Sequence, residues 1–428
     1  MIDLSVEIAG LRLKNPIVVG AGPNTKNLPA AIHCLKAGFG AIVVRSLHRQ
    51  FLDQPLLPVR DFWRIHGAGG NFSRSLYSFQ STAAPAQRIN EKVAHGWGGA
   101  ARIPLLEEWT EEVRKIARAA KEYDCAIIAS IGWCGSNIST EETWRAEAKA
   151  MSEAGVDAIQ LHTAPSPATE PGRYMSMDPQ KYLVRPIQVV KEATRLPVFA
   201  KIPVDCCDSI AMAGMAQKGG ADGVVPVTRW LSLSIDMERE KDPVWRGPGI
   251  GGPWSVPIMN GLIFRMRNAR KPVSYIFQGS SDQFTDSVPV TVPIIPSGGV
   301  RTGEDLIGYL MAGANAAEMC SQVILEGVLA AERIEKEIRT WMEKKGYQTI
   351  SEFQGILRLL EHAKAKDIPQ WQPSIDENRC NGCETCIKAC PNQAIRLFGN
   401  IGKIEEDYCE GCRTCYIVCP AGAISLTP

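Results

Sequence analysis

Short, almost wholly apolar runs alternate with longer amphipathic stretches along most of the chain, beginning near Asn15. Runs such as IVV, AIVV, AIIASI and GVVPV show no alternation of polar and apolar residues, which is typical of strands buried on both faces of a parallel sheet. The predicted strands are Pro16–Val19, Ala41–Arg45, Ala126–Ile131, Asp157–His162, Val198–Ile202, Gly223–Thr228, Val292–Pro296 and Ala316–Cys320.

The stretches between these runs have the pattern of amphipathic helices, and Gly155, Gly220 and Gly313 each follow one as a predicted C-cap. Eight strand–helix units over about 320 residues favour a TIM (β/α)8 barrel over a doubly wound sheet, so the predicted fold class is α/β. The predicted helices are Leu105–Tyr123, Thr140–Ala154, Lys181–Ala193, Ser209–Lys218, Thr302–Ala312, Glu326–Lys345 and Ile350–Ala363.

Two connections, Ser46–Ala101 and Arg229–Val256, are far longer than ordinary strand-to-helix loops, and a polar insert surrounds Gln278–Ser287. Such excess length in a barrel belongs at the carboxyl ends of the strands, where the active sites of barrels lie. We therefore expect these segments to cover a site at that face.

The C-terminal stretch Asp376–Pro428 contains the same run of four cysteines twice, each time as C-x2-C-x2-C-x3-C-P. Thiolates are the soft ligands of iron–sulfur clusters, and the last cysteine of such a run binds the other cluster in two-cluster ferredoxins. The alternative is a pair of structural zinc sites, which use C-x2-C pairs with a longer spacer. The spacing predicts two 4Fe-4S clusters, one held by Cys380, Cys383, Cys386 and Cys419 and the other by Cys409, Cys412, Cys415 and Cys390.

A chain of 428 residues is long enough for a large barrel and a small appendage. We expect an FMN-binding barrel at 1–345, a helical linker at 346–373 and a two-cluster ferredoxin-like domain at 374–428. The net charge of +1 and the lack of a long apolar run argue against nucleic acid and membrane partners. The start of the chain lacks the pattern of a signal peptide and the other cysteines are scattered, which predicts a cytoplasmic protein.

The loops after the last two predicted strands are rich in small residues, PSGGV at 296–300 and MCSQ at 319–322. TIM barrels often bind phosphate in this region, and the helix predicted at Thr302–Ala312 can direct its N-terminus at an anion. A phosphorylated flavin would fit, since clusters that carry one electron need a partner that accepts two. A purely structural turn is the alternative. Gly20-Ala21-Gly22 lacks the rest of a dinucleotide fingerprint, so we expect no NAD site there.

The order of these segments resembles the FMN barrel of the dihydroorotate dehydrogenase family. The doubled cysteine run is similar to the branch in which that barrel is joined to a two-cluster ferredoxin domain, as in dihydropyrimidine dehydrogenase. The resemblance covers nearly the whole chain. The stretches that carry it are NPIVVGAGP, AIVVRS, AIIASIG, DAIQLH, LPVFAKIPVD, GGADGVV, GPGIGG and VPIIPSGGVRTGEDLIGYLMAGA.

The resemblance also implies which residues bind FMN. Lys201 matches the family lysine that contacts the pyrimidine edge and ribityl chain of the flavin, and Ala21 and Gly22 would lie against the ring. Arg45 and Ser46 stand where the family usually has lysine and threonine. The remaining cofactor positions correspond to Thr228, Gly251, Gly252, Ser297, Gly298, Gly299, Cys320 and Ser321.

The stretch that matches the family's catalytic N-x-S-C-P differs here, because residues 162–167 read HTAPSP and contain no cysteine. Ser166 takes the place of the proton donor if one residue is inserted. His162, at the end of a predicted strand, is a second candidate, with a hydrogen-bonded core histidine as the alternative. Together with Lys201, these are the candidate catalytic residues.

The resemblance implies an oxidoreductase acting on CH–CH groups, which uses FMN and two 4Fe-4S clusters to reduce an activated C=C bond of a small, cyclic, pyrimidine-like substrate. Electrons would come from a separate NAD(P)H-oxidising flavoprotein subunit or a ferredoxin, and the chain would form an oligomer. Two alternatives stay open. One is an electron-transfer subunit whose FMN acts only as a relay, and the other is a reductase for a non-pyrimidine substrate.

Overall fold

The computed structural model describes residues 2–46, 60–65, 76–81, 106–132, 140–163, 178–204, 208–227, 230–231, 249–268, 289–357 and 372–427. The chain forms two compact units, one within residues 2–357 and the other at the C-terminal end. Among the described residues, no helix is both long and apolar enough to cross a membrane.

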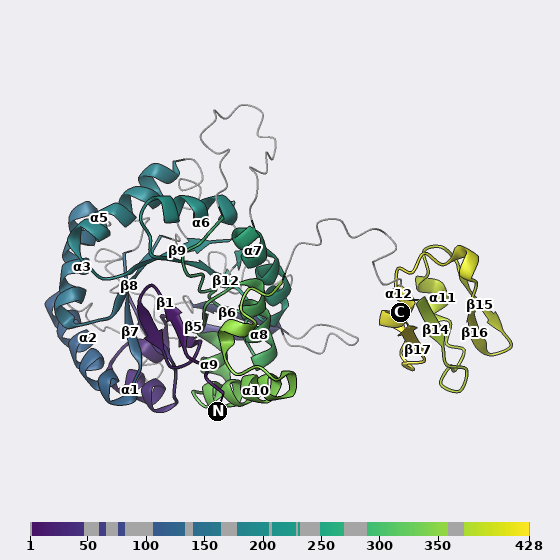
Figure 1. Cartoon of the computed structure of the whole chain (residues 1–428). Coiled ribbons are helices and arrows are strands. Elements are labelled where there is room, and N and C mark those ends of the chain that lie inside the picture. Colours follow the sequence, from purple (N-terminus) through teal and green to yellow (C-terminus); the bar gives the residue numbers. More distant parts are fainter. Residues whose placement is uncertain are drawn as a thin grey trace, which may run out of the picture. The chain divides into compact units, whose positions relative to one another are not determined.

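The first unit is built on a parallel sheet that curls into a barrel (Figure 1). The strands lie in the order β10-β9-β8-β7-β4-β3-β13, and every neighbouring pair is parallel. Nearly all of their residues are buried, as strands covered on both faces require. The strands are β3 (Ile17–Val19), β4 (Ala41–Val44), β7 (Ala126–Ile131), β8 (Ala158–His162), β9 (Val198–Pro203), β10 (Gly223–Val227) and β13 (Ala317–Met319).

The segment predicted as the strand Val292–Pro296 closes the barrel without forming a regular strand. Isolated parallel bridges join Ile294 to Val224 in β10, and Ser297 to Glu318 in β13. Two prolines in this segment have no amide hydrogen, which interrupts the ladder on both sides. The prediction of a regular strand is therefore wrong, whereas the predicted TIM barrel is confirmed because this segment joins the two edges of the sheet.

Helices surround the sheet on its outer face (Figure 1). Gly155 and Gly313 end two of them in the left-handed conformation, with φ of 83° and 115°, as predicted for C-caps. The helices are α1 (Leu28–Lys36), α2 (Leu106–Ala120), α3 (Glu141–Ala154), α5 (Arg185–Ala193), α6 (Ser209–Lys218), α7 (Val256–Asn268), α8 (Gly303–Ala312), α9 (Ser321–Glu326) and α10 (Ala330–Lys345).

Two helix predictions are corrected at glycines. The predicted helix Glu326–Lys345 is interrupted by Gly327, whose φ of +90° ends α9 before α10 begins. Of the predicted helix Ile350–Ala363, only a 3-10 turn at Ile350–Glu352 forms, and Gly355 with φ of +61° lies in the turn after it. Residues 358–363 of that prediction lie outside the described part of the chain.

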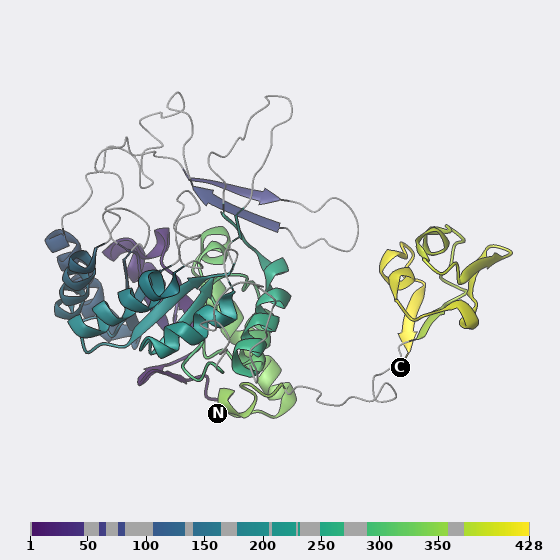
Figure 2. The same ribbon diagram turned by 90° about the horizontal axis from the view of Figure 1, so that it is seen from above.

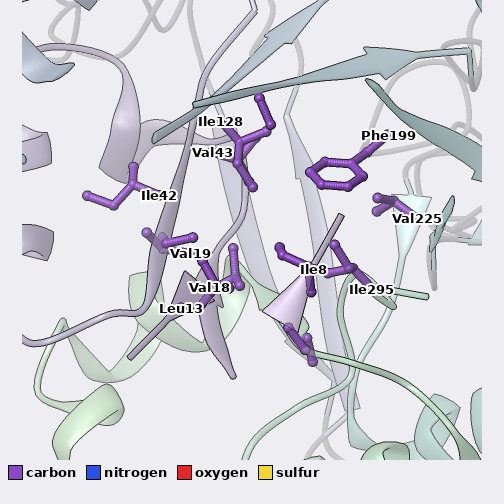
Figure 3. Packing of buried hydrophobic residues seen from close by; sticks show 14 of the residues in the cluster. Ile8, Leu13, Val18, Val19, Ile42, Val43, Ile128, Phe199, Val225 and Ile295 are labelled. Carbon is purple, nitrogen blue, oxygen red and sulfur yellow. The ribbon is translucent and has the colours of Figure 1, made fainter. Parts of the chain in front are cut away.

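A hairpin of β1 (Val6–Ile8) and β2 (Leu11–Leu13) covers the amino-terminal end of the barrel. Ile8 is fully buried and packs with Phe199, Val225 and Ile295 inside the barrel (Figure 3). This apolar layer is the floor of the barrel. Its burial supplies much of the driving force for folding, at roughly 25 cal/mol per Å² of apolar surface.

The two long connections meet in one antiparallel sheet of order β11-β12-β6-β5. One hairpin follows the end of β4 and the other follows the end of β10, so both leave the carboxyl ends of barrel strands. The β5–β6 ribbon lies on the opposite side of the barrel from the β1–β2 hairpin (Figure 2). The insert at Gln278–Ser287 lies outside the described residues. The strands are β5 (Arg60–Ile65), β6 (Leu76–Ser81), β11 (Trp230–Leu231) and β12 (Gly249–Ile250).

The C-terminal unit consists of two matching halves. Thr385 begins one short helix and Thr414 begins the other (385 to 414, 29 positions), and the strands repeat with the same shift. Its small apolar core is a cluster of Ile395, Cys415 and Ile424, and Ala394 and Ala423 are also buried. The elements are β14 (Gln372–Ile375) paired with β17 (Ile424–Thr427), β15 (Ile395–Phe398) paired with β16 (Ile401–Ile404), and the helices α11 (Thr385–Ala389) and α12 (Thr414–Val418).

Candidate functional site

A charged pair lies inside the barrel, on strands that are otherwise apolar. The ammonium group of Lys201 in β9 lies 2.9 Å from Oε2 of Glu318 in β13, and only 9% and 1% of these side chains are exposed. Lys201 Nζ also donates to Oε1 of Gln160 in β8 at 3.1 Å, and the amide of Gln160 donates to the Glu318 carboxylate. These three side chains, which we call the polar triad, form a closed network across the barrel.

The polar triad lies above the apolar floor. Side chains two positions apart in a strand point to the same face, so Lys201 shares its face with Phe199 of the floor. Lys201 is nearer the carboxyl end of β9, which is the end where barrel enzymes bind their substrates. A buried charge costs more free energy than an apolar residue in the same place. A charged group at this position therefore indicates a functional role rather than a stabilising one.

Glycines directly after β3 make room for Glu318 in the neighbouring strand β13 and for Cys320, which follows that strand. A Cβ added at Gly20 would lie 3.2 Å from Oε2 of Glu318, and one added at Gly22 would lie 2.5 Å from Sγ of Cys320. Gly22 and Cys320, two predicted cofactor residues, are thus brought together. Larger residues at either glycine would displace the polar triad or the start of α9.

The loop after the barrel-closing segment turns sharply at Gly298 and Gly299, whose φ values are +100° and +82°. The Tyr309 hydroxyl donates to the Gly298 carbonyl at 3.1 Å, which holds the turn against α8. The amide of Gly298 donates to the carbonyl of Glu318 at 2.8 Å. Because the Gly298 amide is already used in this hydrogen bond, which closes the barrel, a phosphate would have to be bound by other groups of the turn.

The prediction that α8 directs its N-terminus at an anion is wrong. Oδ2 of Asp305 accepts hydrogen bonds from the amides of Arg301 and Thr302, both at 2.9 Å. Oε2 of Glu337 accepts from the amide of Gly303 at 2.6 Å. Two carboxylates of the protein already satisfy these amides and the helix dipole, which leaves no place there for a phosphate.

In the C-terminal unit, the eight cysteines of the doubled run line two separate hollows. The first hollow is lined by Cys380, Cys383, Cys386 and Cys419. The second hollow is lined by Cys390, Cys409, Cys412 and Cys415. Each set takes three cysteines from one run and the last cysteine from the other, which is the crossed arrangement that the spacing predicts.

Backbone amides point at several of these sulfurs. The amide of Ala394 donates to Sγ of Cys390 at 3.2 Å, and that of Ala423 donates to Sγ of Cys419 at 3.3 Å. Four sulfurs spaced around a hollow suit a cluster of several metals better than the zinc alternative.

Comparison with known proteins agrees with both parts. Residues 373–426 match the family model of the 4Fe-4S dicluster domain, and residues 281–342 match that of dihydroorotate dehydrogenase. The chain joins a dihydroorotate dehydrogenase-like barrel to a 4Fe-4S dicluster domain.

The relatives of the dihydroorotate dehydrogenase-like barrel are distant but extensive. A dihydroorotate dehydrogenase A (fumarate) of Limosilactobacillus reuteri is 25% identical over 82% of this chain and 96% of its own length. The catalytic subunit of a dihydroorotate dehydrogenase B (NAD(+)) of Oceanobacillus iheyensis is also 25% identical, over 82% of this chain and 97% of its own length. A chloroplastic dihydropyrimidine dehydrogenase (NADP(+)) of Arabidopsis thaliana is 22% identical, over 82% of this chain and 76% of its own length.

A solved structure shares the fold of the barrel. The dihydroorotate dehydrogenase of Eimeria tenella, in complex with ferulenol, superposes with a TM-score of 0.59 at 20% identity. The match covers 82% of this chain and 88% of the other. At this level of identity the likeness speaks for the barrel fold alone.

The residues of the dihydroorotate dehydrogenase-like barrel fit the FMN that the likeness to dihydroorotate dehydrogenases implies. The polar triad holds a buried cation near the mouth, and the glycines at the end of β3 make room there for Glu318 and Cys320. Cys320 precedes α9, a short helix directly after the last strand, which is where barrels of this kind hold phosphate. These features are the ones that a phosphorylated flavin requires.

The other predicted residues have the following places. Arg45 is buried at the end of β4, and the Ser46 hydroxyl lies 2.7 Å from that of Ser130 in β7. Gly252 accepts a hydrogen bond from the Ser255 hydroxyl at 2.6 Å, where the chain with Gly251 leads into α7. Ala21 is half-buried after β3, Ser297 lies in the barrel-closing segment, and Ser321 begins α9. Ser166 and Thr228 lie outside the described residues.

His162 ends β8 directly beside Lys201 in β9, with which it is in register. It lies two positions after Gln160, so both side chains are on the same face of the strand. The neighbouring Thr163 is buried, and its hydroxyl donates to the carbonyl of Lys201 at 2.5 Å. His162 therefore lies next to the polar triad, on the side of the carboxyl ends.

Sequence reasoning missed two members of the polar triad, Gln160 and Glu318. The available signal was a single polar residue within an apolar strand, in AIQLH and in AEM. Parallel strands buried on both faces rarely contain such residues without a partner. The pairing itself was invisible, because Gln160 and Glu318 are 158 positions apart.

Two thiols elsewhere in the barrel are structural. Burial raises the pKa of Cys34 to about 12 and that of Cys125 to about 12. Both thiols stay protonated at physiological pH, and a protonated thiol is a poor nucleophile and a poor metal ligand.

Proposed function

We propose that this chain is an FMN- and iron–sulfur-dependent oxidoreductase that reduces an activated C=C bond of a small cyclic substrate, in the manner of a dihydropyrimidine dehydrogenase. One observation carries the proposal. A buried cation held at the mouth of a dihydroorotate dehydrogenase-like barrel occurs in the same chain as two hollows that are each lined by four cysteines. The relatives named for dihydroorotate and dihydropyrimidine support the class of substrate.

Lys201 would face the flavin with its position already fixed. Its ammonium group is held by Glu318 and Gln160, so contact with the cofactor would cost little side-chain entropy. FMN, when bound, supplies chemistry that links one-electron and two-electron transfer. A fixed cation beside it favours negative charge on that edge of the ring.

The proton of the reaction would come from the carboxyl end of β8. His162 lies beside Lys201 at that position, and Ser166 follows four residues later in the sequence. A histidine changes protonation state near neutral pH without help, whereas a serine hydroxyl needs a neighbouring base. We therefore propose His162 as the first candidate for proton transfer and Ser166 as the second.

A specific observation favours each of two alternative functions. The stretch at 162–167 has no cysteine, so FMN here could serve as an electron relay within a larger complex. His162 also stands where the family would place an amide partner for a pyrimidine. A site that lacks one such partner leaves a buried group unpaired, at about 1–3 kcal/mol, which favours a non-pyrimidine ring.

Electrons would reach the clusters from another protein. The Gly20-Ala21-Gly22 turn has no dinucleotide fingerprint, so we propose a separate NAD(P)H-oxidising flavoprotein subunit or a ferredoxin as the donor. The chain would work as part of an oligomer with that donor or with copies of itself.

The test is stopped-flow reoxidation of the anaerobically reduced protein. Candidate acceptors are uracil, thymine and orotate, and cyclic enones without ring nitrogens as the matched set. We expect one class to accelerate the return of oxidised flavin absorbance by at least tenfold over buffer. Acceleration by pyrimidines alone supports the pyrimidine label, and acceleration by enones alone supports the non-pyrimidine alternative. If no acceptor has an effect, the relay function replaces the proposal.

A further inference from the structure

The two hollows of the C-terminal unit are related by a shift of 29 positions, so their linings can be compared residue by residue. Cys380 in the first hollow corresponds to Cys409 in the second (380 to 409, 29 positions). Gly402 lines the first hollow, and its counterpart in the second is Pro373 (373 to 402, 29 positions). Pro373 is opposite Leu426 in the antiparallel pair of β14 and β17, as Gly402 is opposite the equivalent Leu397 in the pair of β15 and β16.

This one substitution changes the hydrogen bonds to sulfur. The amide of Gly402 donates to Sγ of Cys380 at 3.4 Å. Pro373 has no amide hydrogen, so it cannot make the corresponding bond to Cys409. Proline is tolerated there because the strand pairing does not use that amide.

The other hydrogen bonds to sulfur are matched between the hollows. Each hollow has one alanine amide that donates to the cysteine of the distant run, at 3.2 and 3.3 Å. A threonine hydroxyl lies 3.4 Å from Sγ of Cys383 in the first hollow, and another lies 3.5 Å from Sγ of Cys412 in the second. Of these hydrogen bonds to sulfur, the one from the Gly402 amide is therefore the one without a counterpart in the other hollow.

An amide that donates to a thiolate ligand stabilises the reduced cluster more than the oxidised one, because reduction adds negative charge to the sulfurs. We propose that the first hollow holds the cluster of higher reduction potential, and that the first electron taken up by the C-terminal unit resides there. This inference rests on the proposal that each hollow binds a 4Fe-4S cluster. It does not depend on the substrate of the barrel.

Nearby charges do not reverse this order. Glu384 lines the first hollow and is paired with Lys388 at 3.9 Å. Glu410 and Arg413 both line the second hollow, so each hollow has one acidic and one basic side chain beside it. These side chains are exposed and screened by salt, whereas the amide points directly at a ligand sulfur.

The test uses two reciprocal variants and one matched control in the holoprotein. Pro373→Ala gives the second hollow an amide, and the space is present because proline already has a Cβ. Gly402→Pro removes the amide from the first hollow. Gly402→Ala adds a Cβ 3.2 Å from Cδ1 of Ile375 but keeps the amide, so it controls for packing. Potentials are measured by anaerobic redox titration with electron paramagnetic resonance, beside iron content and thermal stability.

We expect two separate one-electron steps in the unsubstituted protein. Pro373→Ala should raise only the lower step, by up to about tenfold in the reduction equilibrium, or ~59 mV for a one-electron couple. Gly402→Pro should lower only the higher step, and Gly402→Ala should move neither. The proposal is overturned if Pro373→Ala shifts the higher step or shifts nothing at full iron content, or if Gly402→Ala shifts the higher step as much as Gly402→Pro.

Failure of this inference and failure of the proposed function are separable. If the protein has full iron content but these variants do not change its reduction potentials, it binds clusters whose potentials do not follow the proposed order. A protein with the proposed order that reduces no cyclic acceptor keeps the inference and loses the substrate assignment. A protein that binds no iron when prepared anaerobically loses both.

Discussion

At the scale of single residues, Lys201 depends on Glu318. Both are buried, and their 2.9 Å pair offsets the free energy that each charge lost on leaving water. Gln160 satisfies a further donor of the lysine and donates its own amide to the carboxylate. Replacing such a pair by apolar residues can be neutral, but removing one partner leaves an unpaired charge in the barrel.

Glu318→Gln should therefore lower the free energy of unfolding of the barrel by roughly 3–5 kcal/mol. The double variant Gln160→Glu with Glu318→Gln places a carboxylate on the other neighbour of Lys201, and it should recover most of that loss. Urea unfolding followed by tryptophan fluorescence measures both. A single variant as stable as the original, or a double variant no better than the single one, would contradict this account of the polar triad.

At the scale of elements, α8 shows how a helix in the expected position can lack the expected role. It follows the barrel-closing segment, as a phosphate-binding helix would, but Asp305 and Glu337 already accept hydrogen bonds from its first amides. The carboxylates also neutralise the positive end of the helix dipole. The short helix α9, which begins directly after β13, is the remaining helix of this region for a phosphate.

Asp305→Ala should lower stability by about 1–2 kcal/mol, since it removes the acceptor of two amides at the start of α8. FMN affinity should change less than twofold, because no phosphate is bound there. The control is Glu304→Ala, an exposed residue in the same turn, which should change neither quantity. Chemical denaturation and FMN titration of the flavin-free protein measure the two effects. An increase in FMN affinity for Asp305→Ala would restore α8 as the phosphate site.

At the scale of the whole molecule, the two units owe their stability to different sources. The barrel has a large continuous apolar core, whereas the C-terminal unit buries few apolar side chains, of which Ile395, Cys415 and Ile424 form a cluster. A core of this size is too small to offset the conformational entropy of about 50 residues. The bound clusters must supply the difference, as structural metals do in other small domains.

Removal of iron should therefore unfold the C-terminal unit and leave the barrel folded. We expect hydrogen exchange of residues 372–427 to approach that of an unfolded chain after chelation under reducing conditions, while protection of β3 and β8 is unchanged. Reconstitution with iron and sulfide should restore the protection. Persistent protection of the metal-free tail would show that its small core is sufficient, and loss of protection in β8 would show that the barrel depends on the clusters.

Sequence reasoning reached the local features of this molecule. The apolar runs predicted seven of the barrel strands to within a residue or two, because burial on both faces leaves a continuous pattern in each run. It failed where the outcome depended on neighbours. The eighth segment lost its ladder to two prolines yet closed the barrel through β10 and β13, and two predicted helices were interrupted or shortened where Gly327 and Gly355 turn the chain.

The sequence alone determined the barrel and the crossed sets of cysteines, since the pattern of buried strands and the spacing of ligands each depend only on short stretches of chain. Only the tertiary structure decided which polar side chains meet. Lys201 is 41 positions from Gln160 and 117 from Glu318, and no local pattern relates them. The same holds for the amide of Gly402 and the sulfur of Cys380, whose contact arises because the two halves of the tail fold over each other's cysteines. Contacts of this kind depend on the closed shape, because it alone brings distant segments within hydrogen-bonding distance.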